Sequence, residues 1–103
     1  MQLVGVEPPY EDRFGYFAGQ YLQDIARSGI FLEIPGELSS EGVLQGYVWS
    51  GNTLVNEEML MLGHGFRQNN AADSRYERAL SEAVAVAQSQ GRGIWNYYSP
   101  LMD

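Results

Sequence analysis

The chain has 103 residues, 45% hydrophobic and 13% aromatic, so it is long and apolar enough to bury a core as one domain over residues 1–103. Its 13 acidic residues outnumber six arginines, and there is no lysine, which leaves a net charge of −7. That charge repels polyphosphate unless the arginines cluster, so nucleic acid is not an expected partner. The absence of cysteine excludes a disulfide framework and a thiolate metal site.

The arginines are spread along the sequence, at positions 13, 27, 67, 75, 78 and 92, rather than gathered in one basic stretch. No apolar run approaches the roughly 20 residues that a membrane helix requires. Met1 is not followed by the charged and apolar regions of a signal peptide. These features predict no membrane partner and, by default, a cytoplasmic protein.

Two strands and a helix are predicted in the first third of the chain. Leu3–Val6 is a short apolar run typical of a buried strand, and Pro8 and Pro9 end it. Ile30–Ile34 alternates in the manner of a half-buried strand. Between them a helix is predicted from about Gly15 to Ser28, because apolar residues recur at helical spacing: Phe14, Phe17, Ala18, Tyr21, Leu22, Ile25 and Ala26.

A hairpin and a short helix are predicted next. Val43–Trp49 is β-branched and aromatic, and we expect it to pair with the strand at Ile30–Ile34. The turn residues Gly51–Asn52 follow it. Asn56 is predicted to be the N-cap of the short helix, and Gly63 ends that helix because glycine adopts left-handed dihedrals without strain.

The last helix is predicted to begin at a capping box and to end at about Gln90. Ser74 and Glu77 have the spacing of that box, in which the two side chains bond to each other's backbone N–H groups. Trp95 follows the helix closely, and we expect its large ring to be an anchor of the core.

Four short motifs occur in a particular order along the chain. They are an apolar strand and turn at Leu3–Pro9, the opening of a helix at Phe14–Ala18, the sequence LVNE at Leu54–Glu57, and the helix end at Arg92–Trp95. In this order they resemble the staphylococcal-nuclease-like (thermonuclease) family, whose corresponding motifs read LIGIDTPE, YGxEA, LVNE and GLW or NIW. The resemblance implies an α+β fold, a five-stranded OB barrel with three helices.

The predicted order of elements here is β-α-β-β-α-α, which lacks the first two strands of the family barrel. The resemblance therefore implies an incomplete OB-fold with an open sheet edge. Because an apolar sheet edge is an association site, we expect a homodimer joined through it. Three alternatives to a dimer stay open: the chain is a fragment, the reduced sheet is covered by helices, or the tail from Trp95 to Asp103 caps the gap.

The resemblance also implies a site that cleaves phosphodiesters, with calcium bound by carboxylates and two arginines that hold the phosphate. The first arginine position is Gln2 and the second falls on Val43, so both are neutral here. The glutamate of YGxEA is replaced by Phe17. A metal carboxylate is retained as Glu7, whereas the next carboxylate position is Tyr10.

These substitutions predict a catalytically inactive module that binds a protein or a second copy of itself and needs no cofactor. The alternative is a calcium-dependent nuclease completed by residues outside this chain, with Glu7 as the surviving metal ligand. Glu7, Glu11 and Asp12 form either a metal cluster or the solvated acidic stretch that is usual near a helix start. His64, the only histidine, lies between two glycines and is either a catalytic base or polar surface.

Overall fold

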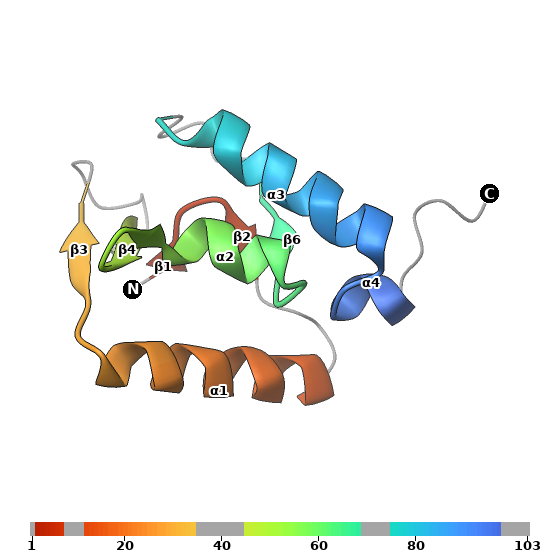
Figure 1. Ribbon diagram of the computed structural model, residues 1–103, viewed down its shortest axis with the longest axis horizontal. Coiled ribbons are helices and arrows are strands. Elements are labelled where there is room, and N and C mark those ends of the chain that lie inside the picture. Colours follow the sequence, from red (N-terminus) through yellow and green to blue (C-terminus); the bar gives the residue numbers. More distant parts are fainter. Residues whose placement is uncertain (1, 8–11, 35–44, 69–74, 98–103) are drawn as a thin grey trace.

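The computed structural model describes residues 2–7, 12–34, 45–68 and 75–97 (Figure 1). Its elements are β1 (Gln2–Leu3), β2 (Val6–Glu7), α1 (Asp12–Arg27), β3 (Phe31–Glu33), β4 (Gln45–Ser50), β5 (Thr53–Leu54), α2 (Val55–Met61), β6 (Phe66–Arg67), α3 (Glu77–Gln90) and α4 (Ile94–Tyr97). Helices combine with small, mainly antiparallel sheets, which confirms the predicted α+β class.

The main sheet has the strand order β1-β4-β3, and β5 also pairs with β4. β1 runs parallel to β4, whereas β3 is antiparallel to it and places Leu32 opposite Val48. The predicted pairing of Ile30–Ile34 with Val43–Trp49 is thereby confirmed over the described residues. β2 and β6 form a separate two-stranded sheet.

The predicted strand at Leu3–Val6 is wrong in one respect, because the chain bends in its middle and forms two strands. Gly5 has φ of 80°, a left-handed conformation that glycine adopts without strain. The Gly5 carbonyl accepts a hydrogen bond from the backbone N–H of Gln68, at 2.9 Å. The bend therefore redirects the chain from β4 towards β6.

The core lies between the main sheet, α2 and α3. Figure 1 shows α2 between α1 on one side and α3 on the other, and α2 packs closely on α3. Tyr47, from β4, is one of the largest buried side chains. The helices contribute apolar residues at helical spacing: Val55, Met59 and Leu60 from α2, and Leu80, Ala83, Val84 and Ala87 from α3.

Both predicted N-caps are wrong, although the helix ends are confirmed. α2 has Leu54 as its N-cap, without a side-chain cap bond, and Asn56 lies inside the helix. α3 has Tyr76 as its N-cap, so Glu77 is its first residue rather than the third residue of a capping box. The end of α3 at Gln90 agrees with the prediction. Pro8, Pro9, Tyr10, Glu11, Val43, Ser74 and the tail after Tyr97 lie outside the described residues.

α1 begins somewhat earlier than predicted, and only part of its predicted apolar stripe faces the core. Ala18 is buried, and Tyr21, Leu22 and Ile25 pack against the core cluster. Phe17 is 54% exposed, however. The helix thus contacts the body along a narrower stripe than its sequence periodicity indicates.

The segment after α3 is anchored by Ile94 more than by Trp95. Ile94 is fully buried, whereas Trp95 is half-buried and meets the ring of Phe66 edge-on, with ring centroids 5.6 Å apart. Trp95, which we expected to be a core anchor, packs against the core cluster and shares that role with Ile94. Within the described part of the chain, no helix combines the length and apolar character needed to cross a bilayer.

Candidate functional site

The positions that the resemblance assigns to catalysis are only partly brought together. Gln2 lies in β1 with Gln45 of β4 as its register partner. Glu7 lies at the end of β2, half-buried, opposite Phe66 of β6. Phe17 is on α1 with its ring largely in solvent. Tyr10 and Val43 fall outside the described residues.

The described residues around Glu7 do not fit a calcium ion. Ca²⁺ takes six to eight oxygen ligands in proteins, several of them carboxylates. Among residues 2–7, 12–34, 45–68 and 75–97, no three acidic, histidine or cysteine side chains form a group suited to a metal. Of the predicted cluster, Glu11 lies outside these ranges, and Asp12 is described only as the first residue of α1, so Glu7 is the member whose side chain is described here.

The arginine beside β2 is part of the fold. Arg67 is the register partner of Val6, and its Nη1 donates a hydrogen bond to the Gly5 carbonyl at 3.2 Å. Its guanidinium also forms an ion pair with Glu77 of α3, and the Arg67 side chain is only 14% exposed. Arg67 therefore connects the bend at Gly5 to α3, and its charge is compensated within the chain.

A second group of polar and aromatic side chains lies on the main sheet, around Glu33 of β3. Trp49 Nε1 donates to Glu33 Oε1 at 2.9 Å, and the Tyr76 hydroxyl donates to the same oxygen at 2.7 Å. Arg75 Nη1 forms an ion pair with Glu33 Oε2 at 2.8 Å. The hydrogen bonds from Tyr76, Trp49 and Arg75 hold the pKa of the Glu33 carboxyl below its ordinary value. Glu33 is therefore ionised at neutral pH.

Aromatic rings surround this carboxylate. Phe31 stacks on Trp49, with centroids 6.3 Å apart and planes only 9° from parallel. Tyr76 meets Trp49 edge-on at 5.7 Å and Tyr47 edge-on at 4.7 Å. These geometries are the favourable ones for aromatic pairs. The rings and the carboxylate thus hold β3, β4 and the start of α3 in one arrangement.

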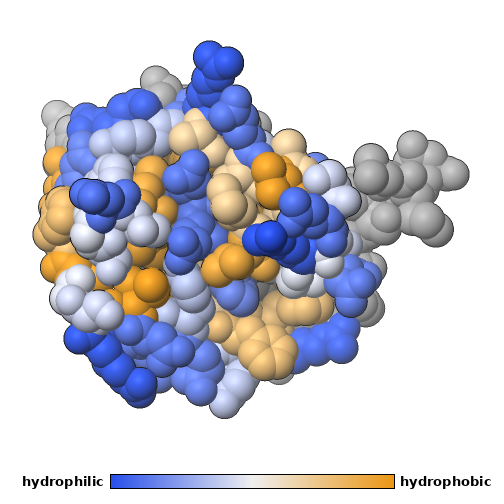
Figure 2. Space-filling model, in the orientation of Figure 1, coloured by the Kyte–Doolittle hydropathy of each residue, from blue (hydrophilic) through white to orange (hydrophobic). Residues whose placement is uncertain are grey.

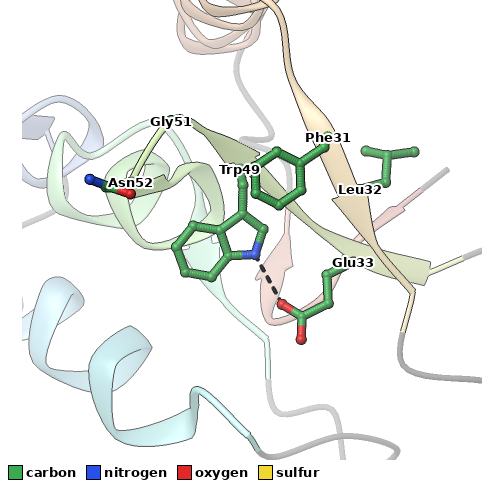
Figure 3. Close-up of a pocket in the computed structure, with 6 residues that line it drawn as sticks. All are labelled: Phe31, Leu32, Glu33, Trp49, Gly51 and Asn52. Atoms are coloured by element: carbon green, nitrogen blue, oxygen red, sulfur yellow. Dashed lines mark hydrogen bonds between the residues drawn. The ribbon is translucent and has the colours of Figure 1, made fainter.

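A hollow of about 490 Å³ lies beside these rings. Its lining is mainly apolar, and Figure 3 shows the Phe31 and Trp49 rings close together with Glu33 beneath the indole N–H. The residues that line it are Phe31, Leu32, Glu33, Trp49, Gly51 and Asn52.

The surface of β3 next to this hollow is strongly apolar. We predicted a half-buried strand, but both of its faces are exposed, and only Glu33 is half-buried. The exposed fractions are 43% for Ile30, 58% for Phe31, 47% for Leu32 and 37% for Ile34. We call these four residues the β3 surface; Figure 2 shows hydrophobic surface at the left of the view, where Figure 1 places β3. A contiguous apolar patch of this kind is typical of a binding surface.

His64 lies at the junction of α1 and α2. Its ring packs on Tyr21, with centroids 5.3 Å apart, and the Tyr21 hydroxyl donates a hydrogen bond to Glu58. Burial, together with Glu58, raises the pKa of Tyr21, and burial lowers the pKa of His64. Neither proposed role of His64 anticipated this packing, in which the imidazole is half-buried between helices.

The lowered pKa of His64 predicts a specific acid sensitivity. Because the folded protein binds the proton less readily than the unfolded chain, stability is lost as pH falls below the ordinary histidine pKa of 6.5. We expect His64→Gln to lose less stability than wild type between pH 7.5 and 5.5, measured by urea denaturation. The stability that the Glu33 carboxylate provides is lost only at lower pH, below the ordinary glutamate pKa of 4.5. The two pH effects therefore separate. Parallel profiles for the two proteins would contradict this assignment.

The Glu33 group was missed by the sequence reasoning. Glu33 and Arg75 are 42 positions apart, and nothing in either local pattern connects them. The one available signal was the charged residue inside the apolar run at Ile30–Ile34. A carboxylate on a sheet next to Trp49 requires partners, and donors from a distant element supply them here.

Comparison with known proteins identifies one matching family. The model of a family described as staphylococcal nuclease homologue matches residues 1–97. No individual curated protein matches the chain. The match covers both the β1–β2 bend with Glu7 and the exposed strand β3, so the whole arrangement described above lies within it. The chain belongs to the staphylococcal nuclease homologue family.

Proposed function

We propose that this chain is a binding module of its family, a single domain over residues 1–103 that recognises a protein without cleaving nucleic acid and without a metal cofactor. The observation that supports this most directly is the loss of cationic side chains where phosphate would bind. Gln2 occupies the first arginine position, and Arg67, the arginine on the strand beside β2, is engaged by Gly5 and Glu77.

The energetic consequence of that loss is large. Phosphoryl transfer depends on arginine and metal charges that stabilise the transition state, and one such arginine contributes roughly 10³- to 10⁵-fold to the rate. With Phe17 in place of a glutamate, a further polar group of the site is replaced by an exposed ring. The net charge of −7 also opposes the approach of a polyanion.

A second candidate function is a calcium-dependent nuclease completed by residues outside this chain. It is favoured by Glu7, which keeps a carboxylate at the end of β2, where the resemblance implies a metal ligand. In that case Glu7 binds the ion and an additional segment supplies the other ligands and the arginines.

A cleavage assay separates these functions. Because the alternative requires a further segment, the assay uses both this chain alone and the full-length product of its gene. We expect both to leave labelled single-stranded DNA and RNA intact with millimolar calcium, because the arginine charges are absent from this chain. Glu7→Gln is the informative variant, and Glu82→Gln, on the exposed face of α3, is the matched control. Sustained cleavage that is stopped by a chelator and abolished by Glu7→Gln, but not by Glu82→Gln, would establish the nuclease instead.

A further inference from the structure

β3 presents an open backbone edge. It stands at the end of the strand order β1-β4-β3, and among the described strands only β4 pairs with it. An edge strand has a row of N–H and C=O groups directed outwards, which another strand can bind. The geometry of β3 therefore suits an extended segment as its partner.

The side chains of β3 restrict what that segment is. Ile30, Leu32 and Ile34 are at alternate positions and so share one face, while Phe31 lies on the other face with Trp49. All four residues of the β3 surface are apolar and exposed. The partner strand must therefore be apolar on the face that it shares with Leu32, whereas on the other face it lies beside both Phe31 and Glu33.

The charge at this edge also restricts the partner. Glu33 is the charged residue among those lining the hollow, and its carboxylate already binds Trp49, Tyr76 and Arg75 of the same chain. A basic partner attracted by the net charge of −7 finds no uncompensated carboxylate among the described residues here. A strand fits this edge if it is mainly apolar and if any charged residue on it is already paired within its own chain. β3 itself meets both conditions, because its Glu33 is paired with Arg75.

We propose that β3 pairs with β3 of a second copy of this chain, antiparallel, about a two-fold axis at Leu32. The proposal rests on the proposed binding function and names its partner. In this register Leu32 lies opposite Leu32 of the second copy, and Ile30 lies opposite Ile34, so like packs on like. Phe31 lies opposite Glu33 of the second copy, which places no two carboxylates face to face.

In this register the second copy also borders the hollow beside Trp49. The strand of the second copy runs along the edge formed by Phe31, Leu32 and Glu33, which is one side of the hollow (Figure 3). The Phe31–Trp49 stack is then covered from the outside. Two three-stranded arrangements of β1, β4 and β3 become one continuous sheet across the dimer, which removes both exposed β3 edges.

Disulfide cross-linking tests the register, because the chain contains no cysteine of its own. Residues directly opposite in an antiparallel pair have Cα atoms about 4.5–5.5 Å apart, within disulfide range. We expect Leu32→Cys to form a covalent dimer under mild oxidation, read on a non-reducing gel. Ile30→Cys and Ile34→Cys should each remain largely monomeric alone but cross-link when mixed, since like positions are about 13 Å apart.

Tyr16→Cys, on the exposed surface of α1, is the control for random collision. Light scattering at micromolar concentration should give twice the mass of 11.5 kDa. Leu32→Asp should return the mass to that of one chain with unchanged circular dichroism, because two carboxylates would then face each other. Added salt should strengthen the dimer, since each copy carries a charge of −7.

The results separate the possible occupants of this edge. Cross-linking of Leu32→Cys no faster than Tyr16→Cys, together with a concentration-independent mass of one chain, would overturn the proposal. A dimer that salt weakens would be held by opposite charges elsewhere on the molecule rather than by the apolar β3 edge. That result would also count against the proposal. The cleavage assay is independent of these measurements, so an active nuclease that still cross-links through Leu32 would refute the proposed function alone.

Discussion

Replacing Gly63 with alanine is expected to lower the free energy of unfolding by about 3 kcal/mol or more. Two causes combine. Gly63 has φ of 76°, which is strained for residues with a Cβ atom. A Cβ there would also overlap the Arg92 carbonyl, lying 2.6 Å from its carbon. Backbone atoms on both sides of this contact leave no side chain that can move away.

Two other glycines serve as controls for the separate causes. Gly51 has φ of 59° but open space around its Cβ position, so Gly51→Ala should show only the dihedral cost of about 1–2 kcal/mol. Gly19 in α1 has neither feature, and Gly19→Ala should be neutral or stabilise by up to about 1 kcal/mol. Urea denaturation followed by circular dichroism compares all three. Equal losses for Gly63→Ala and Gly51→Ala would refute the backbone contact.

Replacing Asn56 with alanine should cost about 2–4 kcal/mol, because it leaves buried backbone groups without partners. Asn56 is fully buried. Its Oδ1 accepts the Val48 N–H at 2.9 Å, and its Nδ2 donates to the carbonyls of Val4 and Gly46 at 3.0 and 3.2 Å. Gly46 retains a second donor, the Val4 N–H. Val48 N–H and Val4 C=O lose the bonds described here.

The matched control is Asn96→Ala, since Asn96 is exposed on α4 and its loss should change stability by less than about 0.5 kcal/mol. Asn56→Asp adds a second test. Its carboxylate would face two carbonyl oxygens, so this variant should be less stable at pH 7 than at a pH low enough to protonate it. If Asn56→Ala unfolded at the same urea concentration as Asn96→Ala, the bridging role of the amide would be excluded.

The parts of the fold that the sequence predicted correctly are those fixed by local chemistry. The end of α3 at Gln90 follows from Gly91, which adopts the left-handed C-cap conformation. The hairpin at Gly51–Asn52 follows in the same way from turn residues between two β-rich runs. In each case the signal and the structure that it specifies lie within a few residues of each other.

The errors arose where a distant contact decides the outcome. Asn56 has the composition of an N-cap, but the backbone groups of β4 and of the β1–β2 bend bind its amide instead, which places it inside α2. Ile30–Ile34 has the alternation of a half-buried strand. Its exposure depends on its place at the end of the sheet order, which periodicity does not reveal.

The residues of the candidate site show the same difference between local and distant signals. Gln2, Glu7 and Phe17 were identified through motifs that can be read along the sequence. The family match confirms the resemblance from which those positions were inferred. The Glu33 group depends on β4 and the start of α3 meeting at β3, so its members come together only in the folded chain.

The parallel pairing of β1 with β4 also sets an order of events as the chain folds. The stretch from β4 through α2 is continuous in sequence, so its hairpin and helix form from local contacts. β1 must instead close a long loop, because Val4 binds Asn56 across 52 residues. Loop closure of this kind has an entropic cost before any contact offsets it, which delays such pairings. We therefore expect β1 to be among the last elements to dock, and the Asn56 amide to stay incompletely bonded until Val4 arrives.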